Sequence, residues 1–278
     1  MSSNLAGLVR NISYEVMPFR RTEHAVLTHV PTSVPLTITV TEAKGLDATL
    51  DLAERLHQHG YRVAPHLAAR QFLDASHVED VVARLREVGI GSVFVIGGDA
   101  PRPAGPFPDA YSLLQMLGHS FAEVGVAGHP EGHATIPREA VDLALKQKAP
   151  LATYAITQIC FNATTTCAWA AGVELPVYVG LPGPVNRQKL VRVTTNIGLG
   201  QSARFVRKQS GLLWRLLLPR GYRPSRFVRR LDAAMSTVDS NIRGLHVFTF
   251  NELHRTERWR QRLLAEVAEW LDVKESRT

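Results

Sequence analysis

Short apolar, β-branched runs alternate with segments of helical periodicity along most of the chain. Such runs of five or six residues are typical of strands buried in a parallel sheet. We predict eight of them, at residues 12–17, 36–40, 62–66, 92–97, 124–128, 153–158, 176–180 and 245–250. Helices between parallel strands are expected, because each connection must bring the chain back to the same edge of the sheet.

The segments between these runs have the spacing of amphipathic helices, most clearly at 46–57 and 78–88. Ser76, with Glu79 three residues later, predicts a capping box at the start of the second of these helices. Eight strand–helix units in 278 residues favour an α/β fold of the (β/α)8 barrel type over an open, doubly wound sheet.

The connection after the seventh predicted strand is much longer than the others and contains the helix-breaking run PRGYRP at 219–224. We expect it to form a helical, basic insertion over one side of the barrel. No low-complexity linker divides the sequence. Residues 1–278 are therefore predicted to form a single barrel domain.

The distribution of charge adds a candidate partner to this picture. The chain has 32 Lys and Arg against 25 Asp and Glu, a formal net charge of +7. No acidic residue occurs between Glu174 and Asp232, a stretch that holds twelve Lys and Arg, from Arg187 to Arg230. Such a segment indicates nucleic acid, an anionic membrane, or a small ligand with phosphate or carboxylate groups; a solvated pair of Arg-rich helices is the alternative.

Other features of the composition indicate the compartment. A hydrophobic fraction of 45% excludes disorder as the global state. The N-terminus lacks a secretory signal, and the run GLLWRLLL is too short for a membrane span and contains Arg215. Cys160 and Cys167 fit reduced thiols buried on a helix face better than a disulfide, a zinc site or a catalytic thiol. We expect a cytoplasmic protein.

Polar residues stand where the predicted strands end, and in a barrel the reacting groups lie at the C-terminal ends of the strands. They are Glu15, Thr39, His66, Asp99, His129, Glu131, His133, Gln158, Thr249 and Asn251. Glu15 lies within an apolar strand, where burial disfavours the ionised carboxylate, and this suits a general acid. An ion pair with Arg20 or Arg21 is the structural alternative.

Two of these residues are suited to polar recognition. Asp99 follows Gly97 and Gly98, which let a ligand approach closely, although a turn or N-cap aspartate is the alternative. Gln158 offers both a donor and an acceptor, either to a heterocycle or to an internal hydrogen bond of the barrel. The sequence contains no GxGxxG fingerprint, P-loop or nucleophile elbow.

The histidines do not predict a metal. His129 and His133 stand four residues apart around Glu131, but they follow a strand and Pro130 separates them, so the HExxH geometry of consecutive helical turns fails. We expect either a loop that lines a ligand or a plain loop. His66 is expected to contact a ligand at the barrel mouth or to be packed beneath it.

Seven short motifs at the strand ends resemble, in the same order, those of the methylenetetrahydrofolate reductase family. They are SYEVMPF at 13–19, IT at 38–39, PHL at 65–67, GGDAP at 97–101, HPEGH at 129–133, ITQICFN at 156–162 and HVFTFN at 246–251. The resemblance implies reduction of 5,10-methylenetetrahydrofolate to 5-methyltetrahydrofolate with NADH or NADPH, a step of one-carbon metabolism that serves methionine biosynthesis.

The resemblance also implies a role for each site residue. Glu15 is expected to be the general acid that protonates N10 of the folate. Asp99 and Gln158 are expected to bind the pterin, with further substrate contacts from Thr39, His66 and Phe248. Contacts to the nicotinamide dinucleotide are expected from His129, His133, Lys148, Arg204, Arg207 and Lys208. The last three lie in the acid-free segment and are the first candidates for the pyrophosphate or for the glutamate tail of the folate.

Departures from the family pattern concern the flavin. Members usually carry FAD in the barrel mouth, held by groups that include an Arg and a Tyr, and here Gly97 and His129 stand at those positions. The helix before the sixth strand keeps Lys148 but lacks the Asn and Arg of the pattern. These losses remove a bidentate phosphate contact and a stacking face. We therefore hypothesise a flavin-free reductase with direct hydride transfer.

Two alternatives stay open at this point. The first is an FAD-dependent reductase of the same family, with contacts rebuilt from Lys148 and the long seventh connection. The second is a non-catalytic barrel that binds RNA or a membrane through the basic segment, but no RNA-binding motif accompanies that segment. We expect folate and a nicotinamide dinucleotide as partners, and neither nucleic acid nor a membrane.

Overall fold

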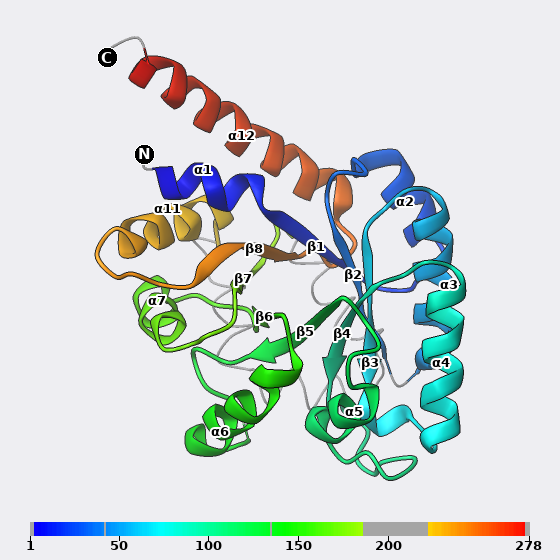
Figure 1. The fold of residues 1–278 in the computed structure, drawn as a ribbon. Helices are drawn as coiled ribbons and strands as arrows, with labels where there is room; N and C mark the ends of the chain where they lie inside the picture. The colour runs from blue at the N-terminus through cyan, green and yellow to red at the C-terminus, as the bar shows by residue number, and fades with distance from the viewer. Residues whose placement is uncertain (1–2, 42, 134, 186–221, 276–278) are drawn as a thin grey trace.

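The computed structural model describes residues 3–41, 43–133, 135–185 and 222–275, and within these ranges parallel strands close into a barrel in chain order, β1 to β8 (Figure 1). The strands are β1 (Ile12–Val16), β2 (Leu36–Ile38), β3 (Val63–Ala68), β4 (Ser92–Ile96), β5 (Glu123–Gly128), β6 (Tyr154–Thr157), β7 (Val177–Pro182) and β8 (Ile242–Phe248). Each predicted strand is confirmed. The largest shift is at β8, which begins at Ile242 rather than at 245.

Helices follow the strands and surround the barrel, so the predicted (β/α)8 fold is confirmed. They are α1 (Ser3–Arg10), α2 (Thr22–His29), α3 (Gly45–Gln58), α4 (Ala75–Glu87), α5 (Ala110–Leu117), α6 (Arg138–Lys148), α7 (Ala163–Ala171), α11 (Pro224–Met235) and α12 (Leu253–Glu275), with short 3₁₀ helices at Ala69–Gln71 and Ala149–Leu151. The final helix, α12, packs along both α1 and α2 on the outside of the barrel (Figure 1).

Two local predictions are wrong. Helix α4 begins at Ala75 and its N-cap is Asp74, whose carboxylate accepts a hydrogen bond from the backbone N–H of His77 at 2.8 Å, so no capping box forms at Ser76. An aspartate in extended backbone just before the first turn can reach that free N–H group. Cys160 is buried, but it lies in the loop after β6 rather than on a helix face; Cys167 is buried within α7.

The long connection after β7 is described only in part. Its last helix, α11, buries Phe227, Val228 and Leu231 and packs against α7 and α1. The rest of the predicted basic insertion, including Arg204, Arg207 and Lys208, lies outside the described residues.

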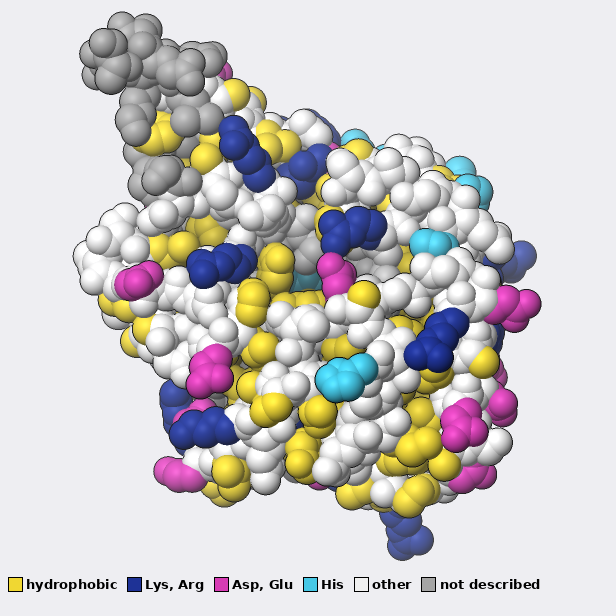
Figure 2. All heavy atoms as spheres, viewed as in Figure 1, with side chains coloured by type: hydrophobic (Ala, Val, Ile, Leu, Met, Phe, Trp, Pro, Cys, Tyr) yellow, Lys and Arg dark blue, Asp and Glu magenta, His cyan; other side chains and the backbone are white. Residues whose placement is uncertain are grey.

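Charged groups of both signs are mixed on the face of the molecule drawn in Figure 2. On the face drawn in Figure 2, Lys and Arg side chains are dispersed among Asp and Glu side chains. No helix among the described residues is both long enough and apolar enough to cross a membrane.

Strand alternation puts polar and aromatic side chains inside the barrel. In β1, Tyr14 points outward, because its hydroxyl donates to Glu257 of α12, and the pleat therefore turns Ser13 and Glu15 inward. The register pairs Ser13 with His246 and Glu15 with both Thr37 and Phe248. Four more side-chain rings, on β3, β4, β6 and β7, point inward, and each lies next to the following one: His66, Phe94, Tyr154 and Tyr178.

Candidate functional site

Glu15 is held between two imidazoles inside the mouth of the barrel. One of its carboxylate oxygens, Oε2, lies 3.9 Å from Nε2 of His66 and 3.9 Å from Nε2 of His246. The Glu15 side chain is 17% exposed, and those of His66 and His246 are 7% and 1% exposed. The carboxylate thus faces these rings and not Arg20 or Arg21, so the ion pair considered as the structural alternative does not form within the described residues.

His246 is fixed by two hydroxyl groups. Its Nδ1 lies 2.8 Å from Oγ of Ser13, and its Nε2 lies 3.4 Å from Oγ1 of Thr37. These contacts come from β1 and β2, on the same side of the barrel as Glu15. The ring of Phe248 stands edge-on to that of His246, with centroids 5.3 Å apart. The imidazole therefore has one orientation beside the carboxyl group.

His66 is a neutral imidazole in this environment. Burial lowers its pKa to about 4, and the opposing attraction of Glu15 does not compensate. Its ring packs on Phe94, with centroids 4.7 Å apart. Nε2 of His66 and Oγ1 of Thr39, on neighbouring strands, are both buried and have no hydrogen-bond partner among the described residues. Buried polar atoms are nearly always paired, so these two are suited to meet a bound ligand.

The loop after β4 presents Asp99 toward solvent. Gly98 has φ +86°, and a Cβ added there would lie 3.1 Å from Cβ of Ala68, so this position requires glycine. The guanidinium of Arg70 holds the loop by donating to the carbonyl oxygens of Ala100 at 3.0 Å and Pro108 at 2.7 Å. Asp99 itself is exposed and makes no hydrogen bond or ion pair with the described residues. Its carboxylate is therefore available to a ligand.

The end of β5 has a different chemistry. Burial, followed by the charges of His133 and Lys148, lowers the pKa of His129 to about 4. The ring of His133 stands edge-on to that of His129 at 5.2 Å. Burial also lowers the pKa of Lys148, whose Nζ donates to the carbonyl oxygen of Ala127 at 3.4 Å. The structure thus brings these three predicted residues together, but His129 adds no positive charge at neutral pH.

Glu131 has a structural task between the loops after β5 and β6. Its Oε1 accepts hydrogen bonds from the backbone N–H groups of Phe161 at 2.6 Å and Asn162 at 2.7 Å. The backbone N–H of Gln158 donates to the carbonyl oxygen of Gly128 at 2.8 Å, while its half-buried side chain lies at the end of β6. Within the described ranges, no group of three or more His, Cys, Asp and Glu side chains could hold a metal ion.

Thr249 and Asn251 hold backbone rather than face a ligand. The hydroxyl of Thr249 donates to the carbonyl oxygen of Glu15 at 2.6 Å. The side-chain amide of Asn251 accepts from the N–H of Met17 at 2.9 Å and donates to its carbonyl oxygen at 3.0 Å. These bonds join the C-terminal ends of β8 and β1, so they fix the backbone that carries Glu15.

The closed strand order places the remaining candidates around one mouth. Four of the candidates lie in one of four consecutive strands, β1 to β4, or directly after it: Glu15, Thr39, His66 and Asp99. In an eight-stranded ring, β4 lies across from β8 and β2 lies across from β6. Asp99 is therefore across from Phe248, and Gln158 is across from Thr39. Polar candidate residues thus stand on opposite sides of the mouth.

Strand-end reasoning did not select His246 or Ser13, which contact each other beside Glu15. His246 lies two residues before Phe248, and Ser13 lies two residues before Glu15, so each shares the inward face of its strand. This period of two can be read from the sequence. The sequence does not show that β1 pairs with β8, and without this pairing Ser13, Glu15 and His246 cannot be brought together.

The sequence of this chain is similar to that of a known protein family. Residues 7–180 match a family model described as methylenetetrahydrofolate reductase. Methylenetetrahydrofolate reductase 2 of Saccharomyces cerevisiae is 27% identical over 141 residues, which are 44% of this chain and 23% of that protein. The chain thus spans about a quarter of the length of this curated relative.

Two solved structures share the barrel fold at low identity. An uncharacterized protein from Clostridium thermocellum, described as binding two copies of 5-methyl-5,6,7,8-tetrahydrofolic acid, has a TM-score of 0.57 at 11% identity, covering 90% of this chain and 95% of that chain. The C-terminal domain of a putative chitinase from Desulfitobacterium hafniense has a TM-score of 0.50 at 11% identity, covering 91% and 99%. Likeness at this identity concerns the fold alone.

Proposed function

This chain belongs to the methylenetetrahydrofolate reductase family, and we propose that it reduces 5,10-methylenetetrahydrofolate to 5-methyltetrahydrofolate with hydride taken directly from NADH or NADPH. The observation that carries the proposal is Glu15, a largely buried carboxyl group oriented by its neighbours inside the barrel mouth. The solved protein that binds methyltetrahydrofolate on a similar barrel supports a folate in this mouth.

The proposed reaction uses Glu15 as a general acid. Glu15 protonates N10, the bond between N10 and the methylene carbon breaks, and a 5-iminium cation forms. A hydride from C4 of the dihydronicotinamide then adds to the methylene carbon, which becomes the N5-methyl group. The products are 5-methyltetrahydrofolate and the oxidised nicotinamide, and Glu15 regains its proton from solvent.

The neighbours of Glu15 act as positioning residues in this proposal. His66 is neutral at neutral pH, so it places no fixed cation against the carboxyl group to oppose protonation. Ser13 and Thr37 hold His246, and His246 in turn limits where the carboxyl group can turn. The hydroxyl of Thr249 anchors the backbone of Glu15 itself.

The residues across the mouth bind the substrate in this proposal. Asp99, with an exposed carboxylate after β4, accepts hydrogen bonds from the pterin and offsets the charge of the iminium cation. Gln158 orients the pterin from the other side, and the half-buried ring of Phe248 packs against it. Thr39 and His66 offer the two buried atoms that lack a partner among the described residues.

The chemistry at the end of β5 does not fit a resident flavin. A flavin diphosphate needs cationic or backbone donors that hold two phosphates through many turnovers. Here Gly97 has no side chain, the lowered pKa of His129 makes its ring neutral, and Lys148 donates to the carbonyl oxygen of Ala127, while burial lowers its pKa. We propose that His129, His133 and Lys148 instead contact the nicotinamide and its ribose through hydrogen bonds, and that Arg204, Arg207 and Lys208 meet the pyrophosphate.

Spectra and kinetics of the purified protein test this proposal. We expect no flavin absorbance, oxidation of NADH or NADPH only when methylenetetrahydrofolate is added, and intersecting double-reciprocal lines, because both substrates must be bound together. Stoichiometric flavin whose removal abolishes activity, or parallel lines typical of a ping-pong reaction, would establish a flavin-dependent reductase instead. Absence of folate-dependent oxidation would contradict the reductase assignment.

A further inference from the structure

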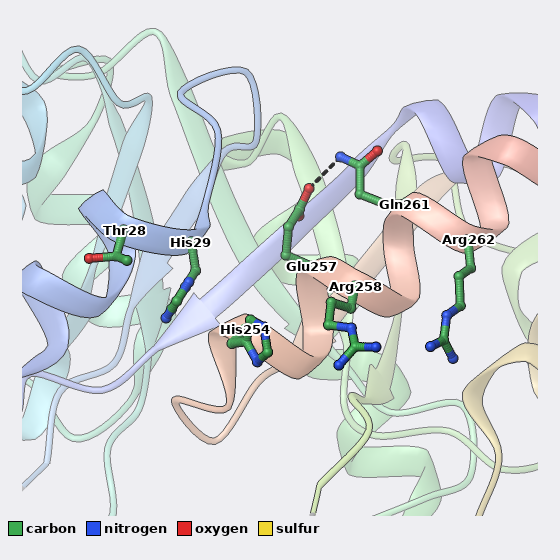
Figure 3. Close-up of a pocket in the computed structure, with 7 residues that line it drawn as sticks. All are labelled: Thr28, His29, His254, Glu257, Arg258, Gln261 and Arg262. Carbon is green, nitrogen blue, oxygen red and sulfur yellow. Dashed lines mark hydrogen bonds between the residues drawn. The ribbon is translucent and has the colours of Figure 1, made fainter.

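A second recess lies outside the barrel, between α2 and α12. It has a cavity volume of about 300 Å³. Its walls are Thr28 and His29 from α2 and His254, Glu257, Arg258, Gln261 and Arg262 from α12 (Figure 3). We call this recess the α2–α12 groove. None of its residues belongs to the site in the barrel mouth.

The groove carries positive charge that no acidic side chain neutralises. Arg258 and Arg262 are exposed, and neither guanidinium makes an ion pair or hydrogen bond with the described residues. They stand one helical turn apart, and Figure 3 shows both side chains extending from α12 in the same direction. Like charges at this spacing repel, so an anion between them would stabilise the helix.

The one carboxylate of the groove is already occupied. Glu257 accepts hydrogen bonds from the hydroxyl of Tyr14 at 2.8 Å and from Nε and a terminal nitrogen of Arg260 at 2.9 Å and 2.8 Å. It also accepts from Nε2 of Gln261 at 2.6 Å (Figure 3). These donors lower the pKa of Glu257 against the opposing effect of burial. Its charge is balanced by Arg260, and Arg258 and Arg262 are left in excess.

Two imidazoles complete the wall of the groove. The rings of His29 and His254 come from different helices and lie 5.0 Å apart, with an angle of 49° between their planes. Each ring can supply an N–H donor beside the guanidinium groups. The hydroxyl of Thr28 donates to the carbonyl oxygen of His24.

We propose that the α2–α12 groove binds a diphosphate, either free or as part of a nucleotide. A guanidinium matches the oxygens of a phosphoryl group in a fork geometry, and two guanidinium groups on successive turns match two linked phosphoryl groups. The recess is large enough for such a group. The site is independent of the proposed reductase reaction, because its residues lie outside the barrel mouth.

Calorimetric titration at low ionic strength tests the proposal, with inorganic pyrophosphate and ADP as probes. The starting protein carries Arg204→Gln/Arg207→Gln/Lys208→Gln, which removes the pyrophosphate contacts proposed for the barrel mouth, and the groove and control substitutions are added to it. In the Arg258→Gln/Arg262→Gln variant, we expect the affinity for both to fall at least tenfold. The matched control is Arg62→Gln/Arg243→Gln, which removes the same charge at two exposed arginines elsewhere. The control should bind within twofold of the starting protein. Thr28→Glu, which places a carboxylate in the groove, should abolish binding by a second route.

The outcomes separate the sources of the diphosphate. Equal affinities for pyrophosphate and ADP would mean that the phosphates alone are recognised, whereas tighter binding of ADP would mean that the imidazoles also contact the nucleoside. Either result supports the proposal. No binding to the starting protein, binding that survives both groove variants, or an equal loss in the control would overturn it.

Discussion

The two sides of the barrel mouth are built differently, although both carry histidines. Around Glu15, hydroxyl groups hold His246, and Thr249 and Asn251 hold the backbone that carries the acid. Beyond the end of β5, the chain is loosely packed. Helix α6 has no fully buried residue, although Lys148 at its end is half-buried, and Ile136 and Leu143 are 46% and 56% exposed.

The difference corresponds to two kinds of task. An acid must meet one atom of its substrate within hydrogen-bond distance, so rigid support on strands is an advantage. A dinucleotide that enters and leaves in each turnover can be met by a surface that adapts. In this proposal, protonation of the substrate therefore depends on the β1–β8 side of the mouth, and the choice of hydride donor depends on the β5–α6 side.

The largest effect is expected from Glu15→Gln, which keeps the shape of the side chain and removes its proton. Turnover should fall by about 10²- to 10⁴-fold, the usual contribution of a general acid, while folate binding stays measurable. Steady-state NADH oxidation and folate titration measure the two effects. Glu123→Gln, an exposed acid at the start of β5, should leave turnover unchanged and serves as the control. Unchanged turnover in Glu15→Gln would remove this residue from the role proposed for it.

An effect of intermediate size is expected when the pH is changed and the unfolding free energy is measured, because buried imidazoles stand on both sides of the mouth. The ordinary imidazole pKa is about 6.5, whereas those of His66 and His129 are lowered to about 4. Between these values the unfolded chain binds more protons than the folded chain. The stability is therefore complete above pH 6.5, falls as the pH drops through this window, and levels off near pH 4.

For His66 alone, this linkage amounts to roughly 3 kcal/mol over the whole window. Urea unfolding at several pH values measures it. His66→Asn, which cannot titrate in this range, should give a shallower dependence of the unfolding free energy on pH. A dependence as steep as that of the unsubstituted protein would mean that His66 is not the neutral, buried group described here.

The smallest effect is expected on the β5–α6 side, from Leu143→Ala. Because Leu143 is 56% exposed, the unfolding free energy should change by less than about 0.5 kcal/mol. The matched substitution Leu85→Ala, at a fully buried leucine of α4, should cost about 2 to 5 kcal/mol. Denaturant unfolding at one pH compares the two. A large cost at Leu143 would show that α6 is packed as firmly as α4 and would remove the contrast between the two sides.

Strand positions could be predicted because a strand of a parallel barrel is a short apolar run, and an interruption such as Glu15 then stands out. The site could be predicted only where a residue ends a strand. His246 could not be found in this way, because its contact with Ser13 depends on the pairing of strands 233 residues apart. Thr249 and Asn251 satisfy the same positional rule as His66, yet they bind backbone, since local sequence does not encode which partner a polar atom meets.

The hydrogen bond between Tyr14 and Glu257 joins residues that are 243 positions apart in the chain. During synthesis, Tyr14 of the first strand must therefore wait for the 243 residues up to Glu257 to leave the ribosome before α12 can cover it. Contacts of such sequence separation form late, because the loop they close is long. Tyr14, the outward-facing neighbour of the acid that we place at the centre of catalysis, is thus among the last residues to be covered, so nascent chains that stop before α12 should leave the outer face of β1 exposed.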